Sequence, residues 1–334
     1  STDGGEIKFH TKSHFTKLAV FTLMMLVMSF INIKYWFSIG YLAYVVVIGL
    51  LVGTYLFGIT SSGSQRWINL YFINLQPSEL MKIFIIVCLA KFFHRKKLEN
   101  VNSIYTILTS LIIILLPMGL VIVQPDLGTA VLIAISGIAV LWFAGTNYKY
   151  FIYTILVFLI SLPFIIAFLK PYQKLRVLTF LNPDKDPLGA GYQIIQSKIA
   201  VGSGGIFGKG FLKGTQSYLE FLPEKHTDFI FTLFSEEFGF VGSAILLVIY
   251  AIIIYRIVAI GANSRSYFAK IFCYSFGAAI FVFITINMSM VLGLLPIVGS
   301  PLPIMSYGGS SMLATMIGFG IVMSARVHNQ QLIA

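Results

Sequence analysis

Stretches of about 20 consecutive apolar residues recur along this 334-residue chain, and they constrain its fold more than any other feature. Each stretch is long enough to cross a hydrocarbon core of roughly 30 Å as a helix. Only helices and closed barrels satisfy backbone hydrogen bonds within lipid, and these stretches are about twice as long as a barrel strand. The sequence therefore predicts an all-α polytopic integral membrane protein.

The composition supports this class of protein. Hydrophobic residues make up 57% of the chain and charged residues 10%, whereas soluble domains have a charged fraction of roughly 25%. The formal net charge of +11 would suit nucleic acid, but much of it lies in short loops, where lysine and arginine set membrane orientation. We therefore expect no nucleic-acid partner. Cys88 and Cys273 both lie in apolar stretches and are predicted to be unpaired.

About nine spans are predicted from the hydrophobic pattern. They fall near residues 16–33, 38–58, 77–94, 104–123, 127–145, 149–169, 230–256, 268–295 and 304–325. The longest connection, 170–229, combines apolar residues at helical spacing with glycine-rich turns, which predicts short amphipathic helices on the membrane surface. Because no internal repeat or second soluble domain is found, residues 1–334 are expected to form a single transmembrane domain.

Three short basic segments predict the orientation: HRKK at 94–97, the segment from Arg256 to Lys270, and ARVH at 325–328. Short basic loops face the cytoplasm, so alternation places the long loop 170–229 outside. With an odd number of spans and a cytoplasmic C-terminus, residue 1 also falls outside. Since the first residues contain no secretory hydrophobic segment, we expect an upstream helix that this chain does not include.

Two charged residues lie three positions apart in the segment QPSELMK. Glu79 and Lys82 share one helical face, and Pro77 followed by an early carboxylate is typical of a helix start. A charge at the centre of a membrane helix costs about 2.5–3.5 kcal/mol or more, so a functional role is the first hypothesis. The pair is either a structural ion pair or the lining of a polar cavity in which Lys82 faces an anionic substrate.

Three further charged residues are predicted on the external side. Arg66, in SSGSQRW, has the planar donor fork that suits phosphate, although an Arg–Trp pair also anchors helices at membrane interfaces. Asp126, in QPDLGT, lies where it can cap the following helix. Lys198, in the long loop, faces either the membrane surface or a phosphate.

Ionisable side chains are densest in LPEKHTDFIF, residues 222–231, immediately before an apolar run. They are Glu224, Lys225, His226 and Asp228. Capping of the following helix explains only part of this cluster. A second external segment, PLPIMSYGGSS, adds the hydroxyls of Ser306, Ser310 and Ser311. Carboxylates, cations and hydroxyls at the outer leaflet together predict a site for a charged, lipid-linked molecule.

The motifs also bear on cofactors. GSGG in the long loop lacks the preceding strand and the GK[ST] ending of a P-loop, so no nucleotide or organic cofactor is expected. His226 has no neighbouring His or Cys at zinc-ligand spacing. An oxygen-rich Mg²⁺ or Mn²⁺ site, which Asp228 would share with a substrate diphosphate, stays open.

Six motifs stand in the order in which one protein family carries them. They are QRWINL, QPSELMK, QPDLGTA, DPLGAGYQIIQSKIAVGSGG, GTQSYLEFLPEKHTDFIF and PLPIMSYGGSS. From about residue 60 to its end the chain resembles the SEDS (shape, elongation, division and sporulation) proteins, and its long-loop motifs are more similar to the elongation branch than to the division branch. The resemblance implies a SEDS-type bundle of ten spans, with both termini in the cytoplasm, in the bacterial cytoplasmic membrane.

The resemblance also implies an activity, the polymerisation of lipid II into glycan strands outside the membrane. Lipid II is a disaccharide-pentapeptide carried on undecaprenyl diphosphate. The implied partners are a class B penicillin-binding protein, whose transpeptidase crosslinks the strands, and other membrane proteins of the elongation complex. Two alternatives remain: a transporter that flips the same lipid, and a scaffold that only recruits the transpeptidase.

The resemblance places an essential aspartate at Asp228. Its other matching positions are Arg66, Glu79, Lys82 and Asp126. Inverting glycosyl transfer needs a base near the attacking hydroxyl and positive charge at the leaving diphosphate. We therefore expect Asp228 to take the proton or to hold a metal ion, and Arg66, Lys82 and Lys198 to bind the diphosphate. Further substrate contacts are expected from Glu224, His226, Ser306 and Ser310.

Overall fold

The computed structural model describes residues 2–3, 6–7, 9–61, 64–69, 74–168, 171–183, 190–214 and 226–333. The chain divides into two compact units. The first unit contains Ser1–Thr146, Ala251–Phe283 and Pro303–Ala334, and the second contains Asn147–Tyr250 and Ile284–Leu302. Two long helices, α10 (Ile230–Asn263) and α11 (Tyr267–Val291), contribute residues to both units.

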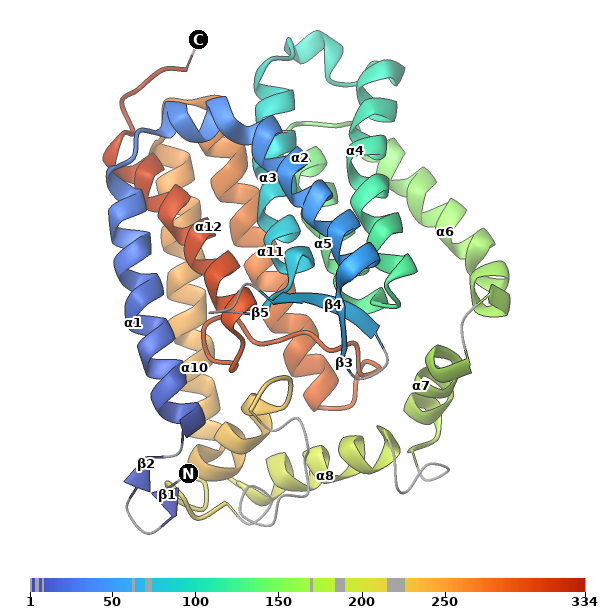
Figure 1. Cartoon of the computed structure of the whole chain (residues 1–334), viewed down its shortest axis with the longest axis vertical. Helices are drawn as coiled ribbons and strands as arrows, with labels where there is room; N and C mark the ends of the chain where they lie inside the picture. The colour runs from blue at the N-terminus through green and yellow to red at the C-terminus, as the bar shows by residue number, and fades with distance from the viewer. Residues whose placement is uncertain are drawn as a thin grey trace. The chain divides into compact units, whose positions relative to one another are not determined.

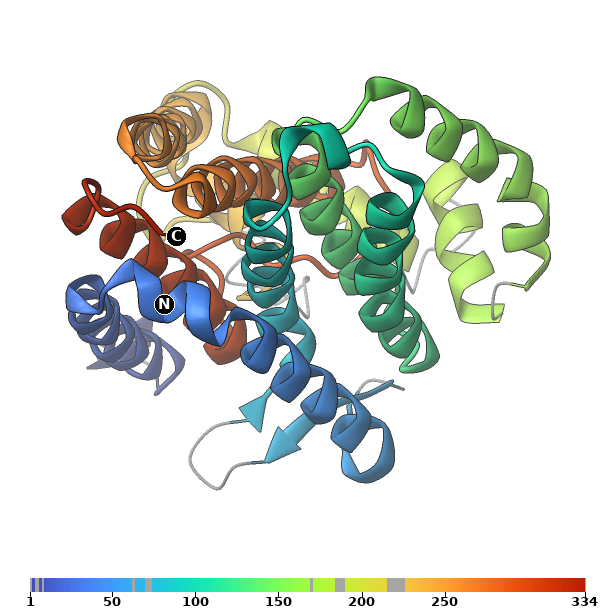
Figure 2. The same cartoon turned by 90° about the horizontal axis from the view of Figure 1, so that it is seen from above.

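The first unit is built around helix α3. Its other helices are α1 (Phe9–Phe30), α2 (Ile33–Phe57), the 3₁₀ turn η1 (Leu98–Asn100), α4 (Ile104–Val123), α5 (Leu127–Phe143) and α12 (Gly309–Val327). Helix α3 (Pro77–His94) contacts α2, α4, α5 and α12, while α1 packs along α12 (Figure 1; Figure 2 shows the same bundle from above). Because nearly every residue of α3 is buried, its charged side chains are shielded from lipid by protein.

All nine predicted spans coincide with helices in the described parts of the chain. Six of these helices are long and apolar enough to cross a membrane: α1 from Thr11, α2, α4, α10, α11 and α12. Helix α5 and residues 148–161 of α6 are apolar but shorter, and α3 carries Glu79, Lys82 and Lys91. Both cysteines are buried free thiols, as predicted.

Four predicted boundaries were wrong by five to seven residues. Helix α2 begins at Ile33 rather than near 38, and α10 ends at Asn263 rather than near 256. Helix α1 begins at Phe9 rather than near residue 16, because the polar residues before the apolar run include no proline or glycine and the helix extends through them. Helix α12 begins at Gly309 rather than near 304. Residues 303–307 form turns and bends instead, and Ile304 has a left-handed φ of 69°, which a helix does not contain.

Short antiparallel strands are present that an all-α prediction did not include. In the first unit, β1 (Thr2–Asp3) pairs with β2 (Glu6–Ile7), and β3 (Ile59–Ser61), β4 (Ser64–Asn69) and β5 (Asn74–Leu75) form a three-stranded sheet between α2 and α3. The sheet pairs backbone groups that have no helical partner. It also fixes the position of Arg66, which lies on β4, relative to the start of α3.

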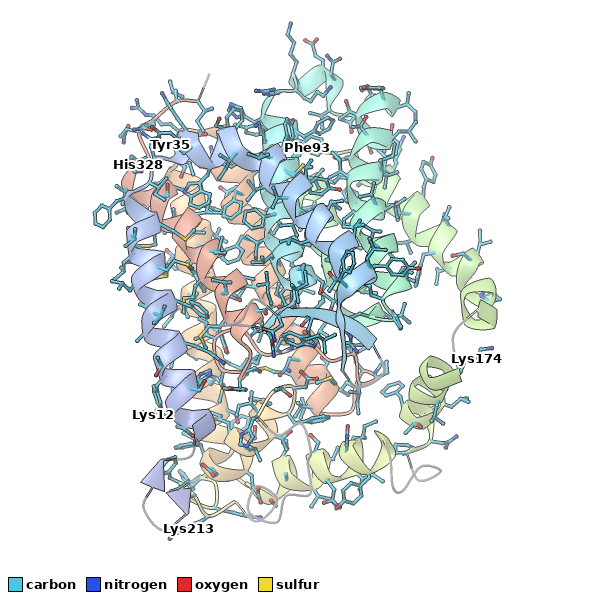
Figure 3. The ribbon with its side chains drawn as sticks, in the orientation of Figure 1. Lys12, Tyr35, Phe93, Lys174, Lys213 and His328 are labelled. Atoms are coloured by element: carbon cyan, nitrogen blue, oxygen red, sulfur yellow. The ribbon has the colours of Figure 1, made fainter. Side chains whose placement is uncertain are left out.

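The three basic segments that predicted the orientation lie at one end of the first unit. His94 Nδ1 accepts a hydrogen bond from the backbone N–H of Phe268 at 3.1 Å, and the N–H of Arg265 donates to the carbonyl of Asn329 at 2.9 Å. Figure 3 shows His328 at this end of the bundle and Lys12 at the opposite end. The predicted clustering of these segments on one side is therefore confirmed.

The second unit contains most of the long loop. Its helices are α6 (Tyr148–Phe168), α7 (Pro171–Leu181), α8 (Ala190–Ser203) and the first part of α10. Helices α7 and α8 confirm that the long loop forms helical segments. Ser197 fixes α8 in place, because its Oγ donates to the carbonyl of Val291 at 2.8 Å and lies 2.8 Å from Thr232 Oγ1.

Candidate active site

Glu79 and Lys82 form a buried ion pair in the first turns of α3. Lys82 Nζ lies 2.8 Å from Glu79 Oε2, and both side chains are 5% exposed. The ammonium also lies 4.8 Å from the centroid of the Phe283 ring. Pro77 at the first helical position and Glu79 in the first turn start the helix as predicted. The predicted pairing on one helical face is confirmed.

A polar network joins the QRW and QPD motifs in the first unit. Arg66 Nη1 lies 3.2 Å from Asp126 Oδ2; the arginine side chain is 26% exposed, the aspartate 3%. Gln76 Nε2 donates to the same oxygen at 3.4 Å. Asp126 also caps α5, because its Oδ1 accepts from the Thr129 N–H at 3.2 Å. The predicted cap is therefore confirmed, and the carboxylate additionally holds an arginine that is accessible to a ligand.

Ser310 connects the third motif, PLPIMSYGGSS, to this network. Its Oγ accepts from the backbone N–H of Gln76 at 2.9 Å and donates to the carbonyl of Asn74 at 3.1 Å. The Ser310 side chain is 1% exposed, so it connects segments of the protein and does not point to solvent. Ser306, at 4%, is buried as well.

Three helix N-termini meet at this network. Helix α3 begins after Gln76, α5 begins after Asp126, and α12 begins one residue before Ser310. Gln76 contacts both of the other residues. Each N-terminus carries about half a positive charge, so the network has a positive potential that a single carboxylate, paired with Arg66, does not cancel. Such a position favours an anion.

In the second unit, Asp228 lies in the turn before α10, where His226 and Asp228 are half-buried. Asn287 on α11, which is fully buried, fixes this turn: its Nδ2 donates to the Asp228 carbonyl at 2.9 Å and to the Ser300 carbonyl at 2.6 Å. A Cβ added to Gly299 would lie 3.5 Å from Asp228 Oδ2, so the carboxylate is directed at this loop. Asn287 was not predicted, although an amide within an apolar run was a usable signal.

Lys198 is exposed on α8, and its side chain runs across the backbone of Gly293. A Cβ at position 293 would collide with Lys198 Cε. This contact turns the lysine toward residues 292–300, the segment that also contains Ser300. Lys198 and Asp228 therefore both border the same loop of the second unit.

The glycine-rich segment 204–214 packs on a break in α10. The break is at Gly239 (φ 65°, ψ −161°). The N–H groups of Lys209 and Gly210 donate to the carbonyls of Glu236 and Glu237, each at 3.0 Å. Lys209 Nζ lies 2.7 Å from the fully buried Glu236 Oε1. The glycines permit this contact, since a Cβ at Gly208 would collide with the Glu237 carbonyl.

The predicted site residues thus lie in both units. Arg66, Asp126 and Ser310 are brought together with Gln76 in the first unit, beside the separate Glu79–Lys82 pair on α3. Asp228, His226 and Lys198 belong to the second unit. Glu224 and Lys225 lie outside the described residues. The convergence of Asp228 with Arg66 and Lys82 stays a prediction.

The groups near Asp228 are oxygen donors, which are the ligands that a divalent cation such as Mg²⁺ prefers. No three His, Cys, Asp or Glu side chains gather into a metal site within the described ranges. Near the turn, Asn287 Oδ1 and Ser300 Oγ are buried without a hydrogen-bond partner. One carboxylate with neighbouring oxygen donors fits Mg²⁺ or Mn²⁺ if substrate phosphates supply the remaining ligands, because Mg²⁺ usually binds through one or two carboxylates together with phosphates.

The fold and these groups define a polytopic membrane protein with ionisable side chains inside its helix bundle. The chain belongs to the cell cycle protein family of FtsW, RodA and SpoVE, whose match covers residues 2–331. It is 43% identical to the peptidoglycan glycosyltransferase MrdB of Escherichia coli (strain K12), over 95% of this chain and 85% of that protein. It is 35% identical to a probable peptidoglycan glycosyltransferase FtsW of Buchnera aphidicola subsp. Baizongia pistaciae, over 94% of this chain and 84% of that one.

Solved structures agree with the fold. A chain from a study of polymerization and crosslinking by a peptidoglycan synthase complex superposes with a TM-score of 0.82 at 29% identity, covering 96% of this chain and 90% of that one. The crystal structure of the rod shape determining protein RodA of Thermus thermophilus gives a TM-score of 0.70 at 24% identity, covering 95% and 87%. At that identity the second likeness supports the fold alone.

Proposed function

We propose that this chain is a peptidoglycan glycosyltransferase that polymerises lipid II into glycan strands during cell elongation. The observation that carries the proposal is the 43% identity, over 95% of the chain, to the peptidoglycan glycosyltransferase of E. coli. The positive network at three helix N-termini supports it, because the substrate carries a diphosphate and the leaving group develops negative charge.

The proposed reaction is an inverting transfer with no covalent enzyme intermediate. A sugar hydroxyl of the acceptor attacks the anomeric carbon of the donor, the bond from that carbon to the diphosphate oxygen breaks, and lipid diphosphate leaves with the bonding electrons. The hydroxyl proton passes to Asp228. The clamp of Asn287 on the Asp228 carbonyl supports this role, because a base must be held within hydrogen-bond reach of its proton.

Positive side chains stabilise the departing diphosphate. Arg66 is partly exposed next to Asp126, so its planar fork is oriented by the carboxylate and still accessible. Lys82 is oriented by Glu79. Lys198 is exposed and directed to the loop at residues 292–300, which the Asp228 carboxylate also faces. His226 and Ser306 are assigned to substrate positioning.

A divalent cation fits the same site. Asp228 would hold it together with diphosphate oxygens, and when bound it would supply positive charge that stabilises the leaving group.

The proposed location is the bacterial cytoplasmic membrane, with the site on the extracytoplasmic side. All nine helices that coincide with predicted spans then cross the bilayer. The clustering of the basic segments at the end of the first unit that contains His94 supports this orientation.

The proposed partner is a class B penicillin-binding protein that crosslinks the new strands, within a larger elongation complex. The similarity to a chain from a complex that couples polymerization with crosslinking supports this assignment. The positive network and Asp228 bind lipid II itself, and no nucleic acid or organic cofactor takes part.

The decisive test supplies purified protein and its cognate partner with lipid II in detergent, where no membrane exists to be crossed. We expect glycan polymer from the wild type and at least about a 100-fold lower rate from Asp228→Asn, the loss typical of a missing general base. Glu99→Gln is the matched control, because Glu99 is an exposed carboxylate of η1 in the first unit. Undiminished polymerisation by Asp228→Asn rejects the assigned base.

The same variants separate the alternative functions. A flippase would move lipid II across vesicle membranes and make no polymer in detergent. A scaffold would tolerate Asp228→Ala in cells as long as its complex with the transpeptidase forms. We expect polymer in detergent and loss of function in cells with the complex intact.

A further inference from the structure

A lysine near the start of α1 has no carboxylate partner in the part of the chain that the structure describes. Lys17 lies within the apolar stretch Thr11–Phe30 and is half-buried. No Asp or Glu of the described residues lies within ion-pair distance of it. A lysine that only anchors a helix extends its ammonium into the water layer, whereas Lys17 Nζ donates to Tyr307 OH at 3.3 Å and lies 4.6 Å from the ring centroid.

The groups around Lys17 are polar and uncharged or basic, so none of them repels a phosphate. Tyr307 OH donates onward to Ser13 Oγ at 3.4 Å, and the His14 ring lies 6.1 Å from the Tyr307 ring. Among its contacts within the described chain, Lys17 uses one of its three ammonium N–H donors on Tyr307. The remaining donors are available to an anion, and a charge inside an apolar stretch is expected to have a functional partner.

Tyr307 belongs to the segment that holds the positive network. It lies three residues before Ser310, whose Oγ accepts from the backbone of Gln76. Gln76 in turn shares its carboxylate partner with Arg66. One short segment of the first unit therefore contacts a cation at each of its ends, Lys17 directly and Arg66 through the network.

We propose that Lys17 and Tyr307 form a second lipid-phosphate site, which holds the diphosphate of one lipid-linked substrate while Arg66 serves the other. The inference rests on the proposed function, because polymerisation joins two molecules that each carry a lipid diphosphate. The recognised group is a phosphate on a membrane-embedded lipid, with the ammonium of Lys17 donating to its oxygens. A phospholipid headgroup presents the same chemistry, so the experiment distinguishes the two sources.

The test counts bound lipids by native mass spectrometry of the full chain with its partner, using undecaprenyl diphosphate as the probe. We expect two molecules on the wild type. Lys17→Met weakens the second by about tenfold or more, the loss expected for one charge-assisted hydrogen bond, and Lys17→Met with Arg66→Gln abolishes both. Lys17→Arg, which keeps the charge, retains two. Lys12→Met is the control, because Lys12 is exposed on the same helix.

The outcomes separate clearly. The inference is overturned if Lys17→Met binds two molecules of undecaprenyl diphosphate with wild-type affinity. It is also overturned if, with phosphatidylglycerol as a second probe, Lys17→Met loses binding of phosphatidylglycerol alone, because the site would then belong to a phospholipid headgroup. Tyr307→Phe, which keeps the ring and removes the hydroxyl, is expected to weaken the second molecule without lowering the melting temperature. Lipid binding needs no turnover. A wild type that binds two lipid molecules but makes no polymer therefore contradicts the proposed function and leaves the second lipid-phosphate site standing.

Discussion

The buried pair Glu79–Lys82 offers a test that separates a structural role from a role in the reaction. Both side chains are 5% exposed, with their charged atoms 2.8 Å apart, and the ammonium faces the Phe283 ring. The perturbation is a cycle of three variants: Glu79→Gln, Lys82→Met, and the two combined. Each single variant removes one charge, and the double variant removes both while keeping side chains of similar size.

The burial of both groups determines the expected magnitudes. Lys82→Met alone leaves a buried carboxylate without its cation, which costs about 3–5 kcal/mol, and Glu79→Gln leaves a buried ammonium at a similar cost. The double variant leaves neither charge and loses the ammonium–ring contact with Phe283, worth about 0.5–2 kcal/mol. We therefore expect the double variant to lie within about 2 kcal/mol of the wild type and above both single variants.

Unfolding in mixed detergent measures stability, and polymerisation of lipid II per folded protein measures activity. If Lys82 stabilises the leaving diphosphate, the stable double variant stays at least about 100-fold slower than the wild type. Lys91→Met is the control, since Lys91 is a second buried lysine of α3 that donates to the Ser38 carbonyl at 2.6 Å. A double variant that polymerises at the wild-type rate would refute the role of Lys82, and one less stable than either single variant would refute the ion-pair reasoning.

Three other predictions follow from the contacts. Arg66→Lys keeps the charge beside Asp126 but loses the planar fork, so we expect an unchanged melting temperature and at least a tenfold lower kcat/KM for lipid II; an unchanged kcat/KM contradicts phosphate binding. Asn287→Ala removes the amide that donates to the carbonyls of Asp228 and Ser300 and should cost about 2–4 kcal/mol of unfolding free energy, with a cost below about 1 kcal/mol contradicting the clamp. Gly208→Ala should lower the melting temperature more than Gly210→Ala, because both have positive φ but only the former meets backbone; equal losses would argue against the packing.

Local features of the site could be predicted from the sequence. The pairing of Glu79 with Lys82 follows from helical spacing, and the cap formed by Asp126 follows from its position before an apolar run. Helix positions followed from hydrophobic runs, because the bilayer fixes their length. The start of α12 was wrong because Ile304 and Met305 score as hydrophobic without being helical, since Ile304 has a left-handed φ.

Contacts between distant segments could not be predicted in the same way. Gln76 pairs with residues 50 and 234 positions away, and neither partner is signalled by local spacing. Asn287 donates to the carbonyls of Asp228 and Ser300, which lie far apart in the sequence and share no local pattern. The docking of the segment 204–214 on α10 depends on the break at Gly239, which hydropathy does not register because the flanking residues are apolar on both sides.

The motifs of the first unit are connected through Gln76. As the residue before α3, it needs a partner for its backbone N–H, and Ser310 at the start of α12 supplies one. Its side-chain amide donates to the carboxylate that caps α5, so three helix starts are connected through one residue.

Three helix N-termini close together concentrate positive potential, which would be unfavourable beside Arg66 unless negative charge is present. Asp126 supplies one such charge, and the remaining positive potential is what a diphosphate would neutralise. Contacts thus connect the motifs QRW, QPSE, QPDLGT and PLPIMSYGGSS into one unit, and we propose that this unit as a whole, rather than any single motif, binds the anion.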